Sequence, residues 1–224
     1  MRLQALSILV AIQLHGIWCA TKPRVICYWA NNLPGGSQPE DIDVTLCTHI
    51  HYAFHVMDAE NTTIVDGRGS PQPDTYNRLL ALKQRNPDLQ VVVSVGGWGH
   101  PDIKFSRVVN SADLRRKFIA NVIPYIQKYK FDGLDLDWEY PVCWTGNCTA
   151  GPKSDRPNFG IFVKEIREAF NRLTPRLTIS AAVVAGYEIA DIAMDYKAIG
   201  EALDYVNIMT YDLAPVTALK TAHH

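Results

Sequence analysis

Short apolar runs alternate along the chain with longer segments in which apolar side chains recur every three or four positions. The short runs are rich in Val, Ile and Tyr, which is typical of strands buried on both faces. The longer segments predict helices, the clearest of which begins after Ser111, a predicted N-cap. Other helical patterns cover residues 158–173, 76–85 and 195–203. The strand patterns cover residues 24–30, 49–56, 90–95, 133–139, 177–185 and 205–211.

Strands that alternate with helices predict an α/β fold with a parallel sheet. An open doubly wound sheet and a TIM (β/α)8 barrel both have this rhythm. No GxGxxG phosphate loop follows the first strand, which favours the barrel. A complete barrel has about 250 residues and eight strands. The sequence has 224 residues and six strand patterns, so we expect about six of the eight βα units.

The first twenty residues have the pattern of a secretory signal peptide. Arg2 precedes an apolar run over residues 3–14 that is too short to span a bilayer. We therefore expect a signal peptide over residues 1–20 and one secreted domain over residues 21–224, without a membrane anchor. Two N-glycosylation sequons, at Asn61 and Asn147, also indicate secretion.

Charge excludes some partners. The chain has 22 basic and 23 acidic side chains, for a net charge of −1. This balance gives no electrostatic reason to bind nucleic acid or an anionic membrane. We expect a monomer with neither partner.

Four cysteines remain when Cys19 is removed with the signal peptide. An even number in an oxidising compartment predicts two disulfides, although four cysteines allow three connectivities. The pairs Cys27–Cys47 and Cys143–Cys148 close the shortest loops and are the ones we predict. A zinc site is the alternative, but the sequence has no CxxC pair.

The most informative segment is acidic and covers residues 131–141. In a strand, Asp135, Asp137 and Glu139 share one face, with successive carboxylates about 6.6 Å apart. An edge strand with its acidic face in water is one interpretation. In a barrel this face points inward, where close carboxylates cannot all be ionised and must share protons. Glu139, at the carboxyl end of the strand, is then the natural general acid. Asp132 has the opposite parity, which predicts a structural role.

This segment resembles the DxxDxDxE signature of glycoside hydrolase family 18, the chitinases and chitinase-like lectins. All four acidic positions are filled, by Asp132, Asp135, Asp137 and Glu139. Other segments resemble the family's first, second, third and sixth strands, and Cys47 stands at the position of the family's disulfide partner of Cys27. These segments are Cys27-Tyr28, Tyr52-Ala53-Phe54, Ser94-Val95-Gly96-Gly97-Trp98 and Met209-Thr210-Tyr211-Asp212.

The resemblance implies retaining, substrate-assisted hydrolysis of chitin or chitooligosaccharides without a cofactor, an exception to the two-carboxylate scheme of most glycosidases. It implies that Glu139 protonates the glycosidic oxygen while the acetamido oxygen of the substrate attacks the anomeric carbon. Asp137 would orient the acetamido group, and Asp135 would tune Asp137. Tyr211 would donate a hydrogen bond to the acetamido carbonyl, and Asp212 would contact the sugar.

Several aromatic and apolar side chains are expected at the same site. Trp98 follows two glycines at a strand end, where its ring can stack on a sugar; a core tryptophan is the alternative. Tyr28 is expected beneath the site, with a core tyrosine as its alternative. Phe54, Tyr140 and Met209 are expected to contact substrate. By parity Trp138 belongs to the core, whereas Trp144 is expected either to pack or to form a rim contact.

His49 and His51 form an HxH pair that supplies two metal ligands in some barrel hydrolases. A metal site needs further ligands, and no other predicted strand end offers a histidine. A metal-dependent hydrolase is therefore the last of our hypotheses. We predict no metal and regard His49, His51 and His55 as core or surface residues.

The sequence departs from the family pattern in two places, and the second departure favours a non-catalytic, chitin-binding protein as the alternative function. Asn32 stands where many active members have a tryptophan, so distal stacking is expected to be weaker. The sequence after Asp212 lacks the seventh and eighth strands, the inserted α+β subdomain and the final-strand tryptophan. The presence of Glu139 favours the enzyme.

Overall fold

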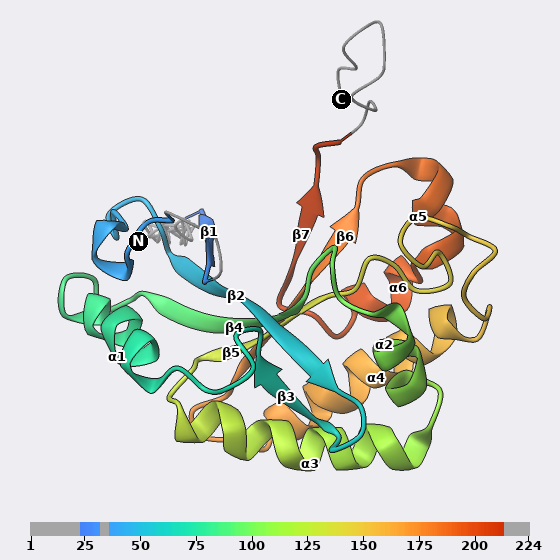
Figure 1. Cartoon of the computed structure of the whole chain (residues 1–224), viewed down its shortest axis with the longest axis horizontal. Helices are drawn as coiled ribbons and strands as arrows, with labels where there is room; N and C mark the ends of the chain where they lie inside the picture. The colour runs from blue at the N-terminus through green and yellow to red at the C-terminus, as the bar shows by residue number, and fades with distance from the viewer. Residues whose placement is uncertain (1–22, 32–35, 213–224) are drawn as a thin grey trace, which may run out of the picture.

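The computed structural model describes residues 23–31 and 36–212. The predicted signal peptide, Asn32 and residues 213–224 lie outside the described residues. Six parallel strands form one sheet in the order β1-β2-β4-β5-β6-β7 (Figure 1). They are β1 (Ile26–Ala30), β2 (His49–Asp58), β4 (Gln90–Gly96), β5 (Gly133–Asp137), β6 (Thr178–Val184) and β7 (Tyr205–Met209).

All six predicted strands are confirmed, with shifts of a few residues at their ends. β5 ends at Asp137 and β7 at Met209, so Glu139 and Tyr211 lie in the loops that follow these strands. A further strand, β3 (Thr63–Asp66), was not predicted and pairs antiparallel with β2. Its four residues are too few to give a periodic signal. The parallel sheet fits a partial TIM barrel.

Helices connect the strands and cover the outer face of the sheet. The Ser111 hydroxyl accepts a hydrogen bond from the Leu114 backbone at 3.3 Å and caps α3 as predicted. α3 and α4 pack beneath the sheet (Figure 1). No helix within the described ranges is long and apolar enough to cross a membrane. The helices are α1 (Pro73–Ala81), α2 (Asp102–Val109), α3 (Ala112–Lys128), α4 (Asp155–Phe170), α5 (Tyr187–Ala193) and α6 (Tyr196–Gly200), with 3-10 turns η1 (Pro39–Asp41) and η2 (Leu82–Gln84).

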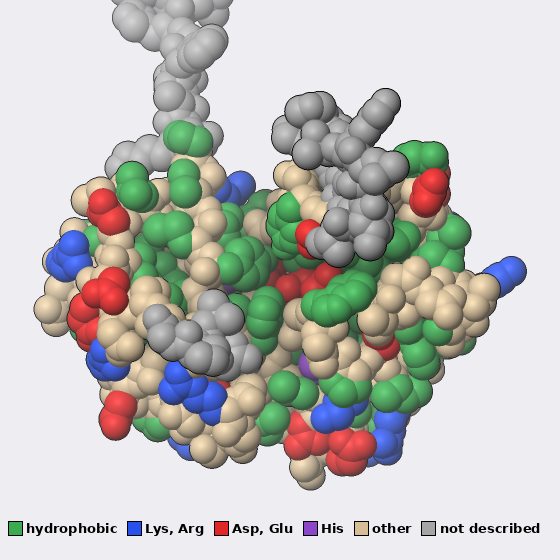
Figure 2. All heavy atoms as spheres, turned by 45° about the horizontal axis from the view of Figure 1, so that its top comes forward, with side chains coloured by type: hydrophobic (Ala, Val, Ile, Leu, Met, Phe, Trp, Pro, Cys, Tyr) green, Lys and Arg blue, Asp and Glu red, His purple; other side chains and the backbone are tan. Residues whose placement is uncertain are grey.

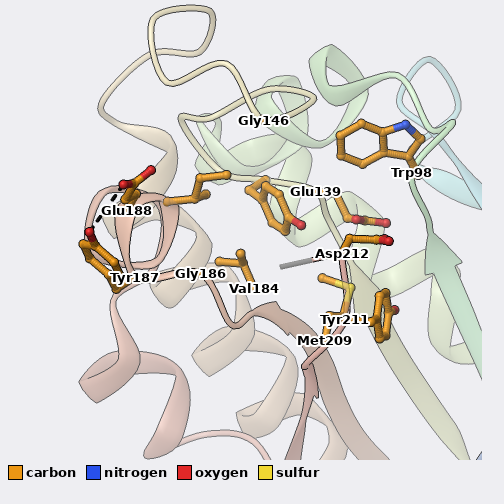
Figure 3. Close-up of a pocket in the computed structure, with 12 residues that line it drawn as sticks. Trp98, Glu139, Gly146, Val184, Gly186, Tyr187, Glu188, Met209, Tyr211 and Asp212 are labelled. Carbon is orange, nitrogen blue, oxygen red and sulfur yellow. Dashed lines mark hydrogen bonds between the residues drawn. The ribbon is translucent and has the colours of Figure 1, made fainter. Parts of the chain in front are cut away.

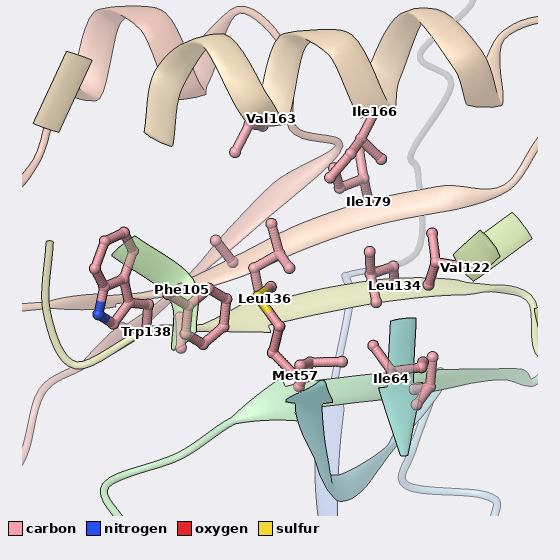
Figure 4. Packing of buried hydrophobic residues seen from close by; sticks show 14 of the residues in the cluster. Met57, Ile64, Phe105, Val122, Leu134, Leu136, Trp138, Val163, Ile166 and Ile179 are labelled. Atoms are coloured by element: carbon pink, nitrogen blue, oxygen red, sulfur yellow. The ribbon is translucent and has the colours of Figure 1, made fainter. Parts of the chain in front are cut away.

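The apolar core lies between the outer face of the sheet and these helices. Leu134 and Leu136 of β5 are fully buried, and Trp138 is 1% exposed (Figure 4). The Trp138 ring stacks on Phe105 of α2, with 5.2 Å between centroids. Trp138 is therefore a core residue, as its parity predicts. Because side chains alternate along a strand, Asp135 and Asp137 face the opposite, concave side.

The sheet curls, so that side chains of β7 reach strands at its other end. The Tyr205 hydroxyl and His51 Nε2 of β2 form a hydrogen bond of 3.0 Å. Asn207 Nδ2 donates to the Tyr28 hydroxyl of β1 at 2.9 Å. The concave side therefore encloses a polar interior around Asp135, although β1 and β7 pair with no further strand among the described residues.

Two disulfides link segments that adjoin β1, β2 and β5. Cys27–Cys47 joins β1 to the residues before β2, and Cys143–Cys148 closes the loop after β5. Both predicted pairs are confirmed.

Candidate active site

A cleft of about 840 Å³ opens at the carboxyl ends of β4, β5, β6 and β7. This is the end of a parallel barrel where catalytic sites form. Acidic side chains lie at its floor between hydrophobic ones (Figure 2). The lining residues are Trp98, Glu139, Tyr140, Gly146, Val184, Gly186, Tyr187, Glu188, Ile189, Met209, Tyr211 and Asp212 (Figure 3).

Two glycines at the end of β4 place Trp98 at the cleft. Gly96 has a φ of +123°, and a Cβ at this position would lie 1.8 Å from the Asp137 carbonyl oxygen. Only glycine allows β4 and β5 to approach this closely. The chain then turns outward, and Trp98 is 59% exposed. This exposure contradicts the core alternative and leaves an indole face available at the cleft.

Asp135 is the most enclosed member of the acidic row and is fully buried. Its carboxylate accepts hydrogen bonds from three hydroxyl groups, two on the adjacent strands β4 and β6 and one on β1. Tyr28 and Ser94 donate to Oδ2 at 2.9 and 2.7 Å, and Ser180 donates to Oδ1 at 2.6 Å. In addition, His51 Nδ1 lies 3.3 Å from Oδ2. The sheet thus supplies donors for an ionised carboxylate.

Asp137 has a different environment, two residues along the same face. It is 4% exposed, and its Oδ1 has no hydrogen-bond partner among the described residues. Burial raises its pKa well above the usual range, and the charges of Asp135 and Glu139 raise it further. By contrast, the pKa of Asp135 is lowered, because His51, Ser180 and Ser94 stabilise its charge by more than burial disfavours it. Two neighbouring carboxyl groups are therefore driven toward opposite protonation states.

Glu139 lies at the mouth of this acidic row and is half-buried. Burial raises its pKa, and the charges of Asp102 and Asp212 act in the same direction, while the Tyr140 hydroxyl opposes them. Glu139 projects toward the same part of the cleft as Asp212 and Trp98 (Figure 3). A carboxyl group with a raised pKa at an accessible cleft is suited to donate a proton.

Met209 at the end of β7, and Tyr211 and Asp212 in the loop after it, form the opposite wall. Burial raises the pKa of Tyr211, and the nearby charges of Asp137, Glu139 and Asp212 raise it further. Its hydroxyl therefore stays protonated and able to donate. Tyr140 follows Glu139 directly and also lines the cleft.

Tyr28 and Phe54 are predicted site residues that are not among the residues lining the cleft. The Tyr28 hydroxyl donates to Asp135, and its ring lies 6.5 Å from that of Phe54 between centroids. A Cβ on Gly97 would lie 2.9 Å from the Phe54 ring, so this ring supports the turn before Trp98.

The remaining sequence-predicted residues have other roles in the structure. Asp132, at the amino end of β5, accepts hydrogen bonds from Lys83 Nζ at 2.7 Å and the Val91 backbone at 2.6 Å. Half-buried Trp144 donates to Asp155 at 2.9 Å. The sequon residues Asn61 and Asn147 are both exposed.

The sequence analysis did not identify two groups of site residues: hydrogen-bond donors to Asp135, and cleft-lining residues of α5. Ser180 and Asn207 have small polar side chains within apolar strands, and this interruption of the apolar pattern was the available signal. Tyr187 and Glu188 belong to α5, a short helix without a clear pattern. His51, considered as a metal ligand, is instead a neighbour of Asp135. Within the described parts of the chain, no group of three or more His, Cys, Asp or Glu residues could hold a metal ion.

Comparison with known proteins identifies the family. Residues 24–224 match the sequence profile described as glycosyl hydrolases family 18. The chain belongs to glycosyl hydrolase family 18. The acidic strand, Trp98 and the loop after β7 all lie within the matched range.

Family 18 relatives are similar over nearly the whole chain. "Probable chitinase 10" of Drosophila melanogaster is 38% identical over 91% of this chain and 9% of the relative. "Probable chitinase 2" of the same organism is 34% identical over 92% of this chain and 45% of the relative. The oviduct-specific glycoprotein of Mus musculus is 36% identical over 95% of this chain and 30% of the relative. The chain thus spans less than half the length of these relatives.

Solved family 18 structures agree with this assignment. Catalytic domain 2 of the Ostrinia furnacalis Group II chitinase is 40% identical, with a TM-score of 0.77, and the match covers 84% of this chain and 50% of that domain. A mutant of that domain was crystallised with penta-N-acetylchitooctaose and has the same TM-score. The fold of this chain is therefore part of a chitinase-type barrel.

Proposed function

We propose that the chain binds chitooligosaccharides and hydrolyses their β-1,4 linkages with retention of anomeric configuration. The observation that carries this proposal is the burial of Asp135 and Asp137 in one row beneath the half-buried Glu139. Three hydroxyl groups hold Asp135, whereas Asp137 Oδ1 has no hydrogen-bond partner among the described residues. A solvated edge strand would leave all three carboxyl groups in water, and the opposite directions of the pKa shifts of Asp135 and Asp137 agree with their burial. The chitin-related names of the relatives and of the solved structures support the choice of substrate.

In the proposed reaction, the Glu139 carboxyl protonates the glycosidic oxygen of the bond that breaks. The acetamido oxygen of the substrate attacks the anomeric carbon from the other side and forms an oxazolinium ion. Protonated Asp137 orients the acetamido group and stabilises this ion, while ionised Asp135 keeps the shared proton on Asp137. Water then opens the ion, and Glu139 accepts the proton of that water.

The cleft walls bind the sugars in this proposal. Trp98 stacks on a sugar face, and the Tyr211 hydroxyl donates to the acetamido carbonyl. Asp212, Tyr140 and Met209 contact the sugars, and Tyr28 and Phe54 support the floor. We also propose a secreted monomer over residues 21–224 that is glycosylated at Asn61 and Asn147. The two disulfides support secretion.

The open side of the sheet favours a second candidate, chitooligosaccharide binding without hydrolysis. Tyr28 and Tyr211 are 41% and 64% exposed, and no described strand covers the free edges of β1 and β7. A cleft as open as the one that the described residues form can hold a sugar chain without excluding water from the reacting bond.

Hydrolysis and binding by the secreted full chain and its Glu139→Gln variant separate these functions. We expect the wild type to hydrolyse a fluorogenic chitotrioside and Glu139→Gln to lose about 100-fold to 10,000-fold in kcat. Both forms should bind chitopentaose in calorimetry. Binding by both forms without any hydrolysis would establish the second candidate, and absence of binding would contradict both.

A further inference from the structure

Asp102 contacts the segments on both sides of Glu139 and is not among the residues predicted from the sequence. It is the first residue of α2 and is 7% exposed. Its Oδ1 accepts a hydrogen bond from Trp138 Nε1 at 2.8 Å, and its Oδ2 accepts one from the Thr145 hydroxyl at 2.9 Å. Trp138 immediately precedes Glu139. The Thr145 backbone N–H donates to the Glu139 carbonyl at 3.1 Å.

Thr145 has a backbone conformation that is unusual for threonine. Its φ is +49°, a left-handed region that β-branched residues rarely adopt. Glycine would adopt this conformation without strain, but it has no hydroxyl group to donate to Asp102. The threonine side chain therefore supplies the link between Asp102 and the loop that holds the Glu139 carbonyl.

Trp138 is fixed by the same helix in two ways. Its ring stacks on Phe105, and its Nε1 donates to Asp102, so α2 holds both the apolar and the polar part of this side chain. If the Asp102 carboxylate were removed, the buried indole N–H would lose its acceptor. The position of the residue before Glu139 thus depends on this carboxylate as well as on the stacking with Phe105.

We propose that Asp102 is a positioning residue that fixes Trp138 and Thr145 and thereby sets the Glu139 carboxyl in the cleft. The proposal rests on the proposed function, because a precisely held acid matters only if Glu139 transfers a proton. A small displacement of such a group is costly, since misplacement of about 1 Å can reduce a rate about 100-fold.

The charge of Asp102 also acts on Glu139. The titratable groups that face Glu139 are Asp137 on β5, Tyr140 beside it, Asp102 on α2, and Tyr211 and Asp212 after β7. Burial is the largest cause of the raised pKa of Glu139, and the charges of Asp102 and Asp212 add to it. Neutral Asp102 would leave burial unchanged but remove one of these charges.

Carbon-13 NMR titration of the Glu139 carboxyl in the full chain tests the proposal without requiring turnover. The Glu139 signal is assigned by its loss in Glu139→Gln. Asp102→Asn retains an acceptor for the indole and removes the charge, so we expect the Glu139 midpoint to move to lower pH. The control is Asp155→Asn. Like Asp102, Asp155 is a buried carboxylate that accepts a hydrogen bond from a tryptophan indole N–H, in this case that of Trp144. An equal midpoint in wild type, Asp102→Asn and Asp155→Asn would overturn the electrostatic part.

Kinetics test the positioning part. Asp102→Ala and the milder Thr145→Val should lower kcat for the fluorogenic chitotrioside, by about 100-fold and about tenfold respectively, with KM nearly unchanged. An unchanged kcat in folded Thr145→Val would overturn the positioning role even if Asp102→Ala did not fold. If no form hydrolysed the substrate but the Glu139 midpoint still moved in Asp102→Asn alone, the proposed function would fail while the electrostatic coupling stood.

Discussion

His51 Nδ1 lies 3.3 Å from Asp135 Oδ2, and both side chains are fully buried. The contact has the distance of an ion pair, although it does not meet hydrogen-bond geometry. It is one reason why the pKa of Asp135 is lowered while that of Asp137, on the same face of β5, is raised. His51 of the HxH sequence, which suggested metal ligation, is instead a buried neighbour of the innermost carboxylate.

Replacement of His51 by glutamine should reduce the difference between the pKa values of Asp135 and Asp137. Without the imidazole, the pKa of Asp135 rises, and the proton is held less selectively by Asp137. We expect kcat to fall about tenfold or more, and the free energy of unfolding to fall by about 1–3 kcal/mol because a buried polar partner is lost. Kinetics and urea unfolding measure both effects. His100→Gln serves as the control, since His100 is a buried histidine that accepts from the Met57 backbone instead; a similar loss of kcat there would contradict the assignment.

Asp137→Asn should stabilise the chain at neutral pH while it impairs hydrolysis. Because the folded-state pKa of Asp137 is raised, its favourable contribution to stability is complete below the unfolded pKa and is lost as the pH rises through the folded pKa. The asparagine removes this loss, and we expect a gain of about 0.5–2 kcal/mol at pH 7. Urea unfolding between pH 3 and pH 8 would show a flatter profile for the variant than for the wild type.

Asp135→Asn is the matched comparison and should have the opposite effect. The folded-state pKa of Asp135 is lowered, so its contribution to stability is present above the unfolded pKa and is lost as the pH falls through the folded pKa. The asparagine also cannot accept from all of the donors around this position. We expect a loss of about 1–3 kcal/mol at pH 7. Equal effects of the two substitutions on stability would contradict the opposite shifts.

Trp98→Ala should weaken the binding of chitooligosaccharides without affecting the free energy of unfolding. The reason is that Trp98 is 59% exposed and does not belong to the buried core. A sugar that covers on the order of 60 Å² of the indole face would gain about 1.5 kcal/mol, or about tenfold in Kd. Calorimetry with chitopentaose measures this loss, and urea unfolding should agree with the wild type within about 0.5 kcal/mol. Unchanged affinity would exclude Trp98 from the binding surface.

Gly96→Ala should prevent correct assembly of the cleft. The new Cβ would lie 1.8 Å from the Asp137 carbonyl oxygen, at a φ that disfavours any other residue. We expect a loss of more than about 4 kcal/mol, seen as a lower unfolding temperature or as insoluble protein. In Gly186→Ala, a Cβ meets no atom within 4 Å, so this cleft-lining glycine is the control and should change stability by less than about 0.5 kcal/mol.

The repeating architecture could be predicted from the sequence because each parallel strand is a nearly continuous apolar run, and the helices between the strands have one apolar face. The Ser111 cap and both disulfides were predicted for the same kind of local reason. β3 was missed because it has only four residues, and α2 and α5 because helices of eight and seven residues are shorter than the window over which a helical period is recognised. Strand ends were also uncertain, so Glu139 and Tyr211 were placed in strands rather than in the loops after them.

Part of the candidate site could also be predicted from local sequence alone. Asp135, Asp137 and Glu139 are consecutive same-face positions of one segment, so their proximity follows from the alternation of side chains. The partners Ser94 and Ser180 are in register with Asp135 on the adjacent strands β4 and β6. Those on β1, β2 and β7 reach Asp135 only because the sheet curls. Asp102 is similar, since nothing in its local sequence indicates that it lies between Trp138 and Thr145.

Proton NMR of the first products most directly tests the claim that this chain is a retaining, substrate-assisted hydrolase. Chitopentaose is incubated with the full chain, and the anomeric protons of the new reducing ends are followed before mutarotation. We predict that the β-anomer forms first with the wild type and that no product forms with Glu139→Gln. Initial formation of the α-anomer, or equal product from the two forms, would contradict the account.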